Sequence, residues 1–349
     1  MKRLLKLFLN YQLKTLRSNG KTGGFTLIEL LVGLILAFLI ITPLLGFVVN
    51  MMDTDRKEQA KATSEQEIQA ALNYISRDLD QAVFIYDAYG LQKIQTQVPQ
   101  VTDGVPVLVF WKRQIIPNIF PTSGLARISD CENNQANQDK CDDAFTYSLV
   151  AYYLIKSQNC AQSPWSCTAR IGRIQLDNEL KNPKDQNDTK PGSPGFQLFP
   201  SSSSSLEQRM NAWTRASGDI DRNPVQILID YVDQTQEQID LAFACPTTAR
   251  PLPRPDLPKN ATDTQAESTP YLYRQVPSYK GTGAVPAQFQ TGSFYACVDA
   301  EQTLAKVYIR GNALARNRPK TQPSQYDPNN TAYFPRASIQ AQGHGLIGQ

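Results

Sequence analysis

The sequence has 349 residues, of which 41% are hydrophobic, and a net charge of +3 at pH 7. This length leaves room for one large folded domain or two smaller ones. The positive charge comes from residues 1–24, which contain no acid and these basic residues: Lys2, Arg3, Lys6, Lys14, Arg17 and Lys21. The remainder is net acidic, which argues against a basic surface for nucleic acid, and no nucleic-acid partner is expected.

The first marked feature along the chain is an apolar run that follows this basic leader. No charged residue occurs between Leu30 and Met52, and the run is long enough to span a bilayer, which needs about 20 residues. A secretory signal peptide has a shorter apolar core followed by a cleavage site of small residues, and neither feature is present. Because basic flanking residues stay in the cytoplasm, we predict one membrane span with residues 1–24 inside and the remainder exported.

A short motif stands at the boundary between the leader and the apolar run. Residues 23–29 read Gly-Gly-Phe-Thr-Leu-Ile-Glu, and this string resembles the cleavage and methylation motif of type IV prepilins. The resemblance implies that prepilin peptidase cuts after Gly24 and that the mature chain starts at Phe25 with an N-methylated amine. It also implies that the helix of residues 25–52 stays in the inner (cytoplasmic) membrane or in a filament core, with the C-terminal domain in the periplasm or in an extracellular filament.

The acidic residue of this motif is unfavourable in a membrane. A carboxylate in a spanning helix costs roughly 2.5 to 3.5 kcal/mol on insertion scales, so Glu29 needs a partner. In the pilin family the matching carboxylate pairs with the N-terminal amine of a neighbouring subunit. The resemblance therefore implies that Glu29 and the amine of Phe25, next to Thr26, set the register of filament assembly. The alternative is a plain signal anchor whose Glu29 faces the lipid headgroups.

Pro43 and Gly46 interrupt the apolar run. A proline inside a helix removes one backbone hydrogen bond and clashes with the preceding turn, so we expect a kink or a locally melted turn there. The resemblance to pilins implies that Pro43 contributes to filament packing. An ordinary, tolerated membrane proline is the alternative.

The helix is predicted to continue as an amphipathic segment over residues 53–86. Apolar residues recur there at helical spacing, at Ile68, Leu72, Ile75, Leu79 and Val83. This pattern predicts a helix from Phe25 to about Ile85 that lies with one face on a sheet. The sequence Arg-Asp-Leu at residues 77–79 resembles the end of this helix in the J-type minor pseudopilins of type II secretion and in the W-type minor pilins.

Beyond the helix, apolar residues recur with the period of two that is typical of strands. We predict strands at residues 105–111, 145–155, 169–176, 225–232, 238–244, 294–298 and 304–309, with hairpins over 145–176 and 294–309. The predicted fold is α+β and pilin-like, with the long N-terminal transmembrane helix packed on an antiparallel β-sheet. The exported domain is expected to span residues 87–315 with long loop insertions at 177–206 and 246–290, followed by a disordered tail at 316–349.

Six cysteines lie beyond the apolar run, and an even number in an exported region indicates disulfide bonds. Many pairings of these cysteines exist, and spacing alone does not establish geometry. Close spacing favours two small closed loops, which leaves the last two cysteines as a pair: Cys131–Cys141, Cys160–Cys167 and Cys245–Cys297. The spacing does not fit a zinc knuckle, and no metal site is predicted from these residues.

The sequence motifs of common enzymes are absent. His344 is the only histidine, and there is no phosphate-binding loop, metalloprotease motif or nucleophile elbow, so neither an enzymatic activity nor a cofactor is predicted. One oxygen-rich loop is a candidate for calcium, although it matches no EF-hand and a solvated acidic loop is the alternative: Asp177, Asn178, Glu179, Asp185, Asn187 and Asp188.

The aromatic residues suggest a second candidate site, a surface on which saccharide rings stack. The commoner role of such residues is in a core or an interface. The set comprises Tyr86, Tyr89, Trp111, Tyr152, Tyr153, Trp165 and Trp213.

Within the pilin family, the chain resembles the pseudopilins of hormogonium polysaccharide secretion in filamentous cyanobacteria. This resemblance implies a minor pseudopilin, a structural subunit of a short filament that supports polysaccharide secretion and gliding motility. The implied partners are prepilin peptidase, other pilins or pseudopilins, an inner-membrane assembly platform, membrane lipid and the exported polysaccharide. Two alternatives remain open: a minor pilin at a pilus tip that serves adhesion, motility or DNA uptake, and a membrane-anchored receptor or enzyme that uses the helix only as a tether.

Overall fold

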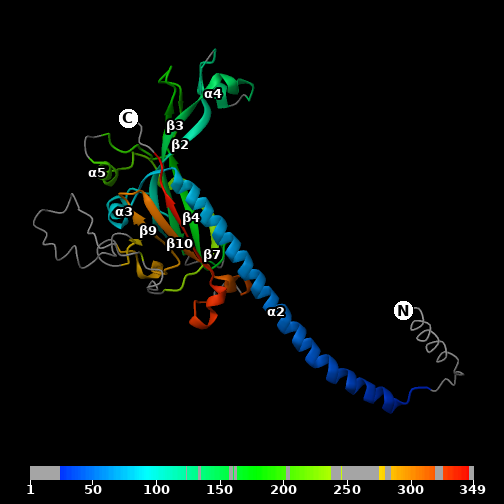
Figure 1. The fold of residues 1–349 in the computed structure, drawn as a ribbon. Coiled ribbons are helices and arrows are strands. Elements are labelled where there is room, and N and C mark those ends of the chain that lie inside the picture. The colour runs from blue at the N-terminus through cyan, green and yellow to red at the C-terminus, as the bar shows by residue number, and fades with distance from the viewer. Residues whose placement is uncertain are drawn as a thin grey trace, which may run out of the picture. The chain divides into compact units, whose positions relative to one another are not determined.

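The computed structural model describes residues 24–122, 124–132, 135–156, 160, 163–201, 205–236, 245, 275–279, 284–318 and 325–345. Residues 1–23 of the predicted leader, the predicted strand at 238–244 and most of the predicted loop 246–290 lie outside these residues. The chain divides into two units, Met1–Asp55 and Arg56–Gln349. The first consists, where described, of one helix and the residues before it, and the second contains the sheets (Figure 1).

One long helix, α2 (Leu27–Asp80), belongs to both units. Its apolar side chains up to Met52 are exposed, whereas from Ala60 onward one stripe is buried in the second unit. The predicted end at about Ile85, and with it the helical segment 53–86, extends too far. Ala82–Ile85 forms strand β1 instead, because a run of β-branched and aromatic side chains fits a buried strand better than a helix end.

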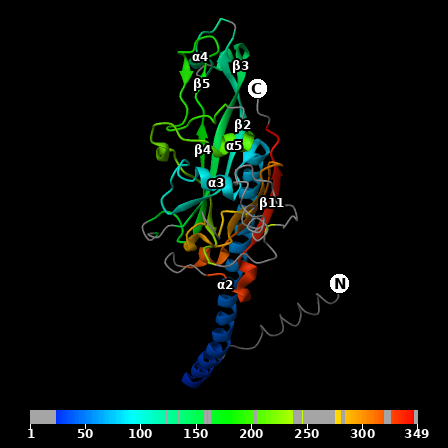
Figure 2. The ribbon, with the colours of Figure 1, turned by 90° about the vertical axis from the view of Figure 1, so that its left-hand side faces the viewer.

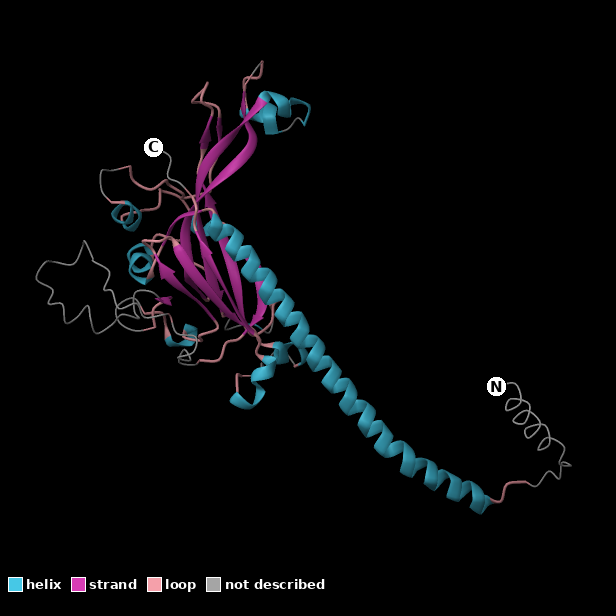
Figure 3. Cartoon of the chain, viewed as in Figure 1, coloured by secondary structure: helices cyan, strands magenta, loops and turns pink. Residues whose placement is uncertain are grey.

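The first sheet has five antiparallel strands in the order β1-β2-β3-β4-β7. Its remaining strands are β2 (Gly104–Pro121), β3 (Cys141–Ile155), β4 (Ala169–Asp177) and β7 (Gln226–Val232). The predicted hairpin over residues 145–176 is confirmed by the pairing of β3 with β4. Figure 3 shows the strands beside α2, and in Figure 2 the short helices α3 (Ala88–Ile94) and α5 (Leu206–Asn211) lie in front of the first sheet.

The second sheet has four antiparallel strands in the order β11-β10-β9-β8. They are β8 (Gln275–Val276), β9 (Phe294–Asp299), β10 (Leu304–Arg310) and β11 (Arg336–Gln342). The predicted hairpin over residues 294–309 is confirmed as β9–β10. Two short strands, β5 (Leu180–Lys181) and β6 (Thr189–Lys190), pair within the predicted loop 177–206.

The remaining described helices are short. They are α4 (Ile128–Glu132) and the 3-10 turns η1 (Gln135–Lys140), η3 (Ile220–Arg222), η5 (Ala287–Phe289), η6 (Ala313–Asn317) and η7 (Pro328–Tyr333). One continuous core joins the buried stripe of α2 to both sheets. The coarse prediction is confirmed: the fold is α+β, with a long apolar N-terminal helix and antiparallel sheets.

Aromatic side chains fill the face of the first sheet that lies away from α2. Trp111 of β2 contacts the rings of Phe199 and Trp213 at centroid distances of 5.1 and 5.7 Å. Its indole N–H donates to the hydroxyl of Tyr86, which donates in turn to the carbonyl of Met210. The predicted loop 177–206 therefore contributes Phe199 to the core.

The prediction of a disordered tail at 316–349 is wrong for the described residues 316–318 and 325–345. Arg316 and Asn317 belong to η6, and the Arg316 side chain donates to the hydroxyl of Ser64 on α2. Strand β11 pairs with β10 along its whole length, from Leu304↔Gln342 to Arg310↔Arg336. The backbone then crosses to the end of α2, where the N–H groups of His344 and Gly345 donate to the carbonyls of Asp80 and Ala82. The strand was missed because its small and polar side chains show little alternation, and its stability comes from the backbone ladder.

This crossing predicts a requirement for glycine at position 345. A Cβ atom at Gly345 would lie 2.5 Å from Cγ1 of Val83 and 2.7 Å from the carbonyl oxygen of Gln81. We expect Gly345→Ala to lower the free energy of unfolding by about 1 to 3 kcal/mol, the usual range for overpacking. Thermal unfolding measures the effect, with His344→Ala as the control because the side chain of His344 is exposed. Equal stability of the two variants would show that residue 345 does not pack closely against Gln81 and Val83.

Candidate functional site

The motif residues lie at the beginning of α2. Gly24, Phe25 and Thr26 precede the first helical residue, and the side chain of Phe25 is 80% exposed. The backbone N–H of Glu29 donates to two oxygen atoms of Thr26. The side-chain hydroxyl accepts at 3.4 Å and the backbone carbonyl at 3.0 Å. Threonine is a preferred residue at this capping position. The peptide bond between Gly24 and Phe25 therefore lies in exposed, non-helical backbone before the cap.

Glu29 lies in the first turn of α2 and is exposed. A carboxylate at this end interacts favourably with the positive end of the helix dipole. Within the described part of the chain, no cation lies at ion-pair distance from it. A cationic partner for this carboxylate must therefore come from outside the described residues.

The segment from Leu27 to Met52 exposes apolar side chains on all sides. Leu27 is 90% exposed, Phe38 71% and Phe47 70%. Among the described residues, α2 is the one helix that is long and apolar enough to cross a membrane. The position of this segment near the N-terminus agrees with the predicted single membrane span.

Pro43 lies inside α2, and the helix continues unbroken through it. Of the two expectations, a kink or a locally melted turn, the melted turn is therefore wrong. The hydroxyl of Thr42 donates to the carbonyl of Phe38 at 2.8 Å, and such side-chain bonds help to satisfy the backbone groups near a proline in a membrane helix.

Asp78, the middle residue of the Arg-Asp-Leu sequence, connects the other end of α2 to the first sheet. Asp78 is 8% exposed and accepts three hydrogen bonds. They come from Nζ of Lys112 on β2 at 2.9 Å, from the hydroxyl of Tyr152 on β3 at 2.7 Å and from Nε of Arg173 on β4 at 2.7 Å. One carboxylate thus connects the helix to three neighbouring strands. We call these four residues the Asp78 cluster.

The charges of the Asp78 cluster favour the ionised carboxylate. Burial alone would raise the pKa of Asp78, but the hydrogen bond from Arg173 and the positive charges of Lys112 and Arg173 outweigh it, so the pKa lies below its ordinary value. Burial and the adjacent carboxylate raise the pKa of Tyr152 well above its ordinary value. The cluster therefore consists of one anion, two cations and a neutral phenol at neutral pH.

A second carboxylate continues this polar network along the sheet. Gln175 accepts from Nη2 of Arg173 at 2.5 Å and donates to Oδ1 of Asp177 at 2.6 Å. The hydroxyl of Ser148 also donates to Oδ1 of Asp177, at 2.8 Å. Sequence reasoning singled out Asp78 only by resemblance and missed its partners. Lys112 follows directly on the apolar run of β2, and Arg173 lies between Ile171 and Ile174 on β4; charged residues beside such apolar residues were the available signal.

The structure contains the three disulfides that the spacing favours: Cys131–Cys141, Cys160–Cys167 and Cys245–Cys297. The oxygen-rich loop does not form the predicted calcium candidate. Asp177 faces the network described above, whereas Oδ2 of Asp188 accepts from the backbone N–H of Ile128 at 2.8 Å and from Nδ2 of Asn182. Among the described residues, no group of three or more acidic, histidine or cysteine side chains is arranged to hold a metal ion.

Most residues of the predicted saccharide-stacking set belong to the core. The rings of Tyr86, Trp111, Tyr152, Tyr153 and Trp213 are buried. Tyr89 is half-buried under Lys93, and Trp165, in the loop closed by Cys160–Cys167, is 38% exposed. The set does not form a common surface.

No family model, curated protein or solved structure matches the chain.

Proposed function

We propose that the protein is a minor pseudopilin, a structural subunit of a type IV pilus-like or type II secretion-like filament, and not an enzyme. The observation that carries this proposal is the Gly-Phe-Thr-Leu-Ile-Glu string at residues 24–29, placed where an apolar helix begins. The exposed bond between Gly24 and Phe25 suits a peptidase substrate. Glu29, which has no cationic partner within the described residues, suits pairing with the N-terminal amine of a second subunit.

The arrangement of α2 gives further support. The same helix is apolar and exposed in its first part and buried against the sheets in its last part. The Asp78 cluster, together with the buried stripe that begins at Ala60, connects the last part of the helix to the sheets. This arrangement supports a pilin-like fold and an inner-membrane location with the sheets in the periplasm or in a filament.

We further propose that the filament supports polysaccharide secretion and gliding motility, on the resemblance described above. Its partners on this proposal are prepilin peptidase, other pseudopilins, an inner-membrane assembly platform and membrane lipid. Deletion of the gene is expected to reduce exported polysaccharide and gliding together. Loss of pilus-dependent motility or DNA uptake with normal polysaccharide export would favour a pilus-tip role instead.

The mass and N-terminal sequence of the protein extracted from membranes test the assignment. We expect a mature chain that begins at Phe25 with a methylated amine in cells with prepilin peptidase, and the full chain from Met1 in cells without it. A chain that begins at Met1 in both strains would overturn the filament proposal and leave a signal-anchored protein.

A further inference from the structure

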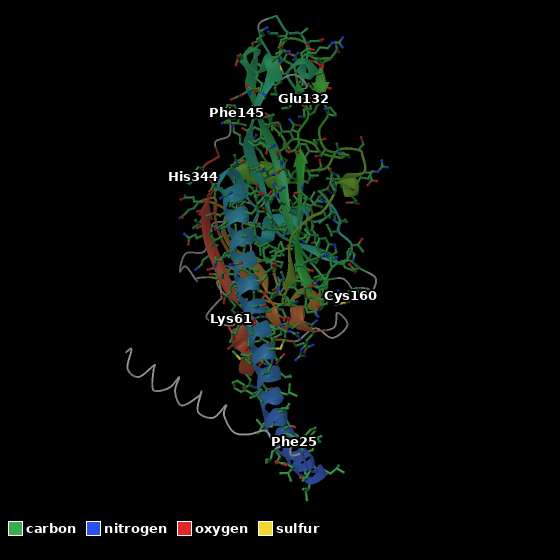
Figure 4. All side chains as sticks on the ribbon, turned by 90° about the vertical axis from the view of Figure 1, so that its right-hand side faces the viewer. Phe25, Lys61, Glu132, Phe145, Cys160 and His344 are labelled. Carbon is green, nitrogen blue, oxygen red and sulfur yellow. A yellow bond between two sulfur atoms is a disulfide. The ribbon has the colours of Figure 1, made fainter. Side chains whose placement is uncertain are left out.

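The second sheet ends on one side in β11, a regular strand that pairs with β10 along its whole length. All 7 of its residues, from Arg336 to Gln342, keep a single register with β10, and none of them is a proline. Figure 4 shows this strand at the margin of the sheet, just before the labelled residue His344. The other side of β11 therefore faces away from the sheet.

The hydrogen bonds at the two ends of this ladder show which backbone groups of β11 face outward. The N–H of Gly343 donates to the carbonyl of Thr303, and the N–H of Gly311 donates to the carbonyl of Pro335. Bonded pairs alternate along an antiparallel ladder, so the odd-numbered residues of β11 bond to β10 and the even-numbered residues point their N–H and C=O groups away from it. After Arg336, these outward groups form what we call the open edge, on Ser338, Gln340 and Gln342.

The open edge lacks a partner among the described residues. No backbone hydrogen bond from the rest of the described chain reaches its N–H and C=O groups. The side chains of Ser338, Gln340 and Gln342 are exposed and uncharged. A regular strand edge of this kind is a template for pairing with another chain.

The other three outermost strands of the two larger sheets are protected. The first, β1, has 4 residues, and the N–H of Gly345 donates to its carbonyl at Ala82. The pairing of β7 with β4 is irregular, and Val232 of β7 forms a bridge to Gly311. Strand β8 has 2 residues and is followed by Pro277. Short length, irregular pairing, proline and cover are the ways in which native proteins block unwanted strand pairing, and the open edge of β11 has none of them.

The direction of β11 restricts which segment can pair with it. Pro335, before its start, lies beside Gly311, which packs closely against Ile68 of α2, and the N–H of His344, after its end, donates to the carbonyl of Asp80. The strand therefore runs in the same direction as the last part of α2. Two β11 strands paired across a twofold axis would run in opposite directions, and so would their α2 helices. A second copy anchored through α2 in the same membrane cannot supply its β11 in this way, which favours a strand of a different protein.

We propose that the open edge receives an extended, uncharged segment of a different protein, which adds to the second sheet as a further strand antiparallel to β11. Main-chain hydrogen bonds to the open edge supply the affinity, as in other cases of strand addition. An uncharged segment fits because the side chains along the open edge carry no charge that would attract an ionic one. The inference goes beyond the filament proposal and is independent of the role of Glu29, since β11 belongs to the second unit.

Hydrogen exchange of the wild-type chain tests whether the open edge is occupied. The chain is labelled in native membranes and, separately, after purification in detergent. We expect the amides of Ser338, Gln340 and Gln342 to exchange at least about 10-fold more slowly in the membranes, where the partner is present. The amides of Ile339 and Ala341 are the internal control, because they face β10 and should exchange slowly in both samples. The mass of the N-terminal peptide from the same membranes reports processing separately, so that failure of this proposal and failure of the filament proposal are distinct results.

Proline substitution tests whether the cover is a strand. Gln340→Pro removes an N–H that makes no bond to β10, so the fold is expected to tolerate it, as thermal unfolding can verify. In membranes this variant should lose the slow exchange of Ser338 and Gln342. Gln340→Thr keeps the N–H and is the matched control, which should exchange like the wild type. If Gln340→Pro fails to fold, Ser338→Pro takes its place, because the N–H of Ser338 also faces outward.

Three results would overturn the proposal. The first is equal exchange of the open edge in membranes and in detergent. The second is slow exchange in membranes that the proline variant leaves unchanged, which would indicate a cover other than a strand. The third is a slowing in detergent that increases with protein concentration, which would indicate that a second copy of this chain occupies the edge.

Discussion

Replacing Asp78 with alanine is expected to lower the free energy of unfolding of the second unit by about 3 to 5 kcal/mol, the usual result of removing one partner from a buried ion pair. In the wild type the side chains of Lys112 and Arg173 are each 7% exposed. The variant leaves both of them buried. Both cations then lose their common anion, and the end of α2 loses its connection to three strands. Chemical denaturation of the full chain measures the loss. Asp80→Ala is the matched control, because Asp80 belongs to the same helix turn and is exposed.

Acid should weaken the same cluster in the wild-type protein. The pKa of Asp78 is lower in the folded chain than its ordinary value. Its contribution to folding stability is therefore fully present above the pKa of Asp78 in the unfolded chain, and it is lost as the pH falls through the pKa of Asp78 in the folded chain. We expect the wild type to lose stability below about pH 4 and Asp78→Asn to lose less over that interval, because it carries no titrating group there. Parallel pH profiles for the two proteins would show that Asp78 is not the group responsible.

The sequence was sufficient to predict the features that depend on local pattern. The apolar helix, the hairpins around residues 160 and 300 and the three disulfides follow from periodicity and close spacing. The helix end was placed too late because Val83 fits the helical stripe as well as it fits a strand. The pairing of Ala82, Phe84 and Ile85 with β2 is what places these residues in a strand.

Features that depend on distant partners were not predictable in this way. Asp78 and Arg173 are 95 positions apart, and nothing local in either segment identifies the other. The same holds for β11, whose partner β10 supplies backbone hydrogen bonds rather than a side-chain pattern.

Glu29→Ala is expected to abolish incorporation into filaments while leaving the folded unit unchanged. Glu29 lies in the first unit, is exposed and has no cationic partner within the described residues, so its removal costs the second unit no contact. In a filament, the loss of its ion pair with a neighbouring amine removes the interaction that compensates a membrane carboxylate. The fraction of the protein in sheared filaments, relative to the membrane fraction, measures incorporation.

Two further variants decide between an assembly residue and a tolerated charge. Glu65→Ala changes an exposed glutamate on the second part of the same helix and should assemble normally. Glu29→Gln keeps the size and hydrogen-bonding capacity of the side chain but not its charge. It should fail like Glu29→Ala if an ion pair sets the register, and it should assemble if Glu29 only accepts a hydrogen bond. Normal function of all three variants would indicate that α2 is a membrane tether, and the receptor or enzyme interpretation would then replace the filament one.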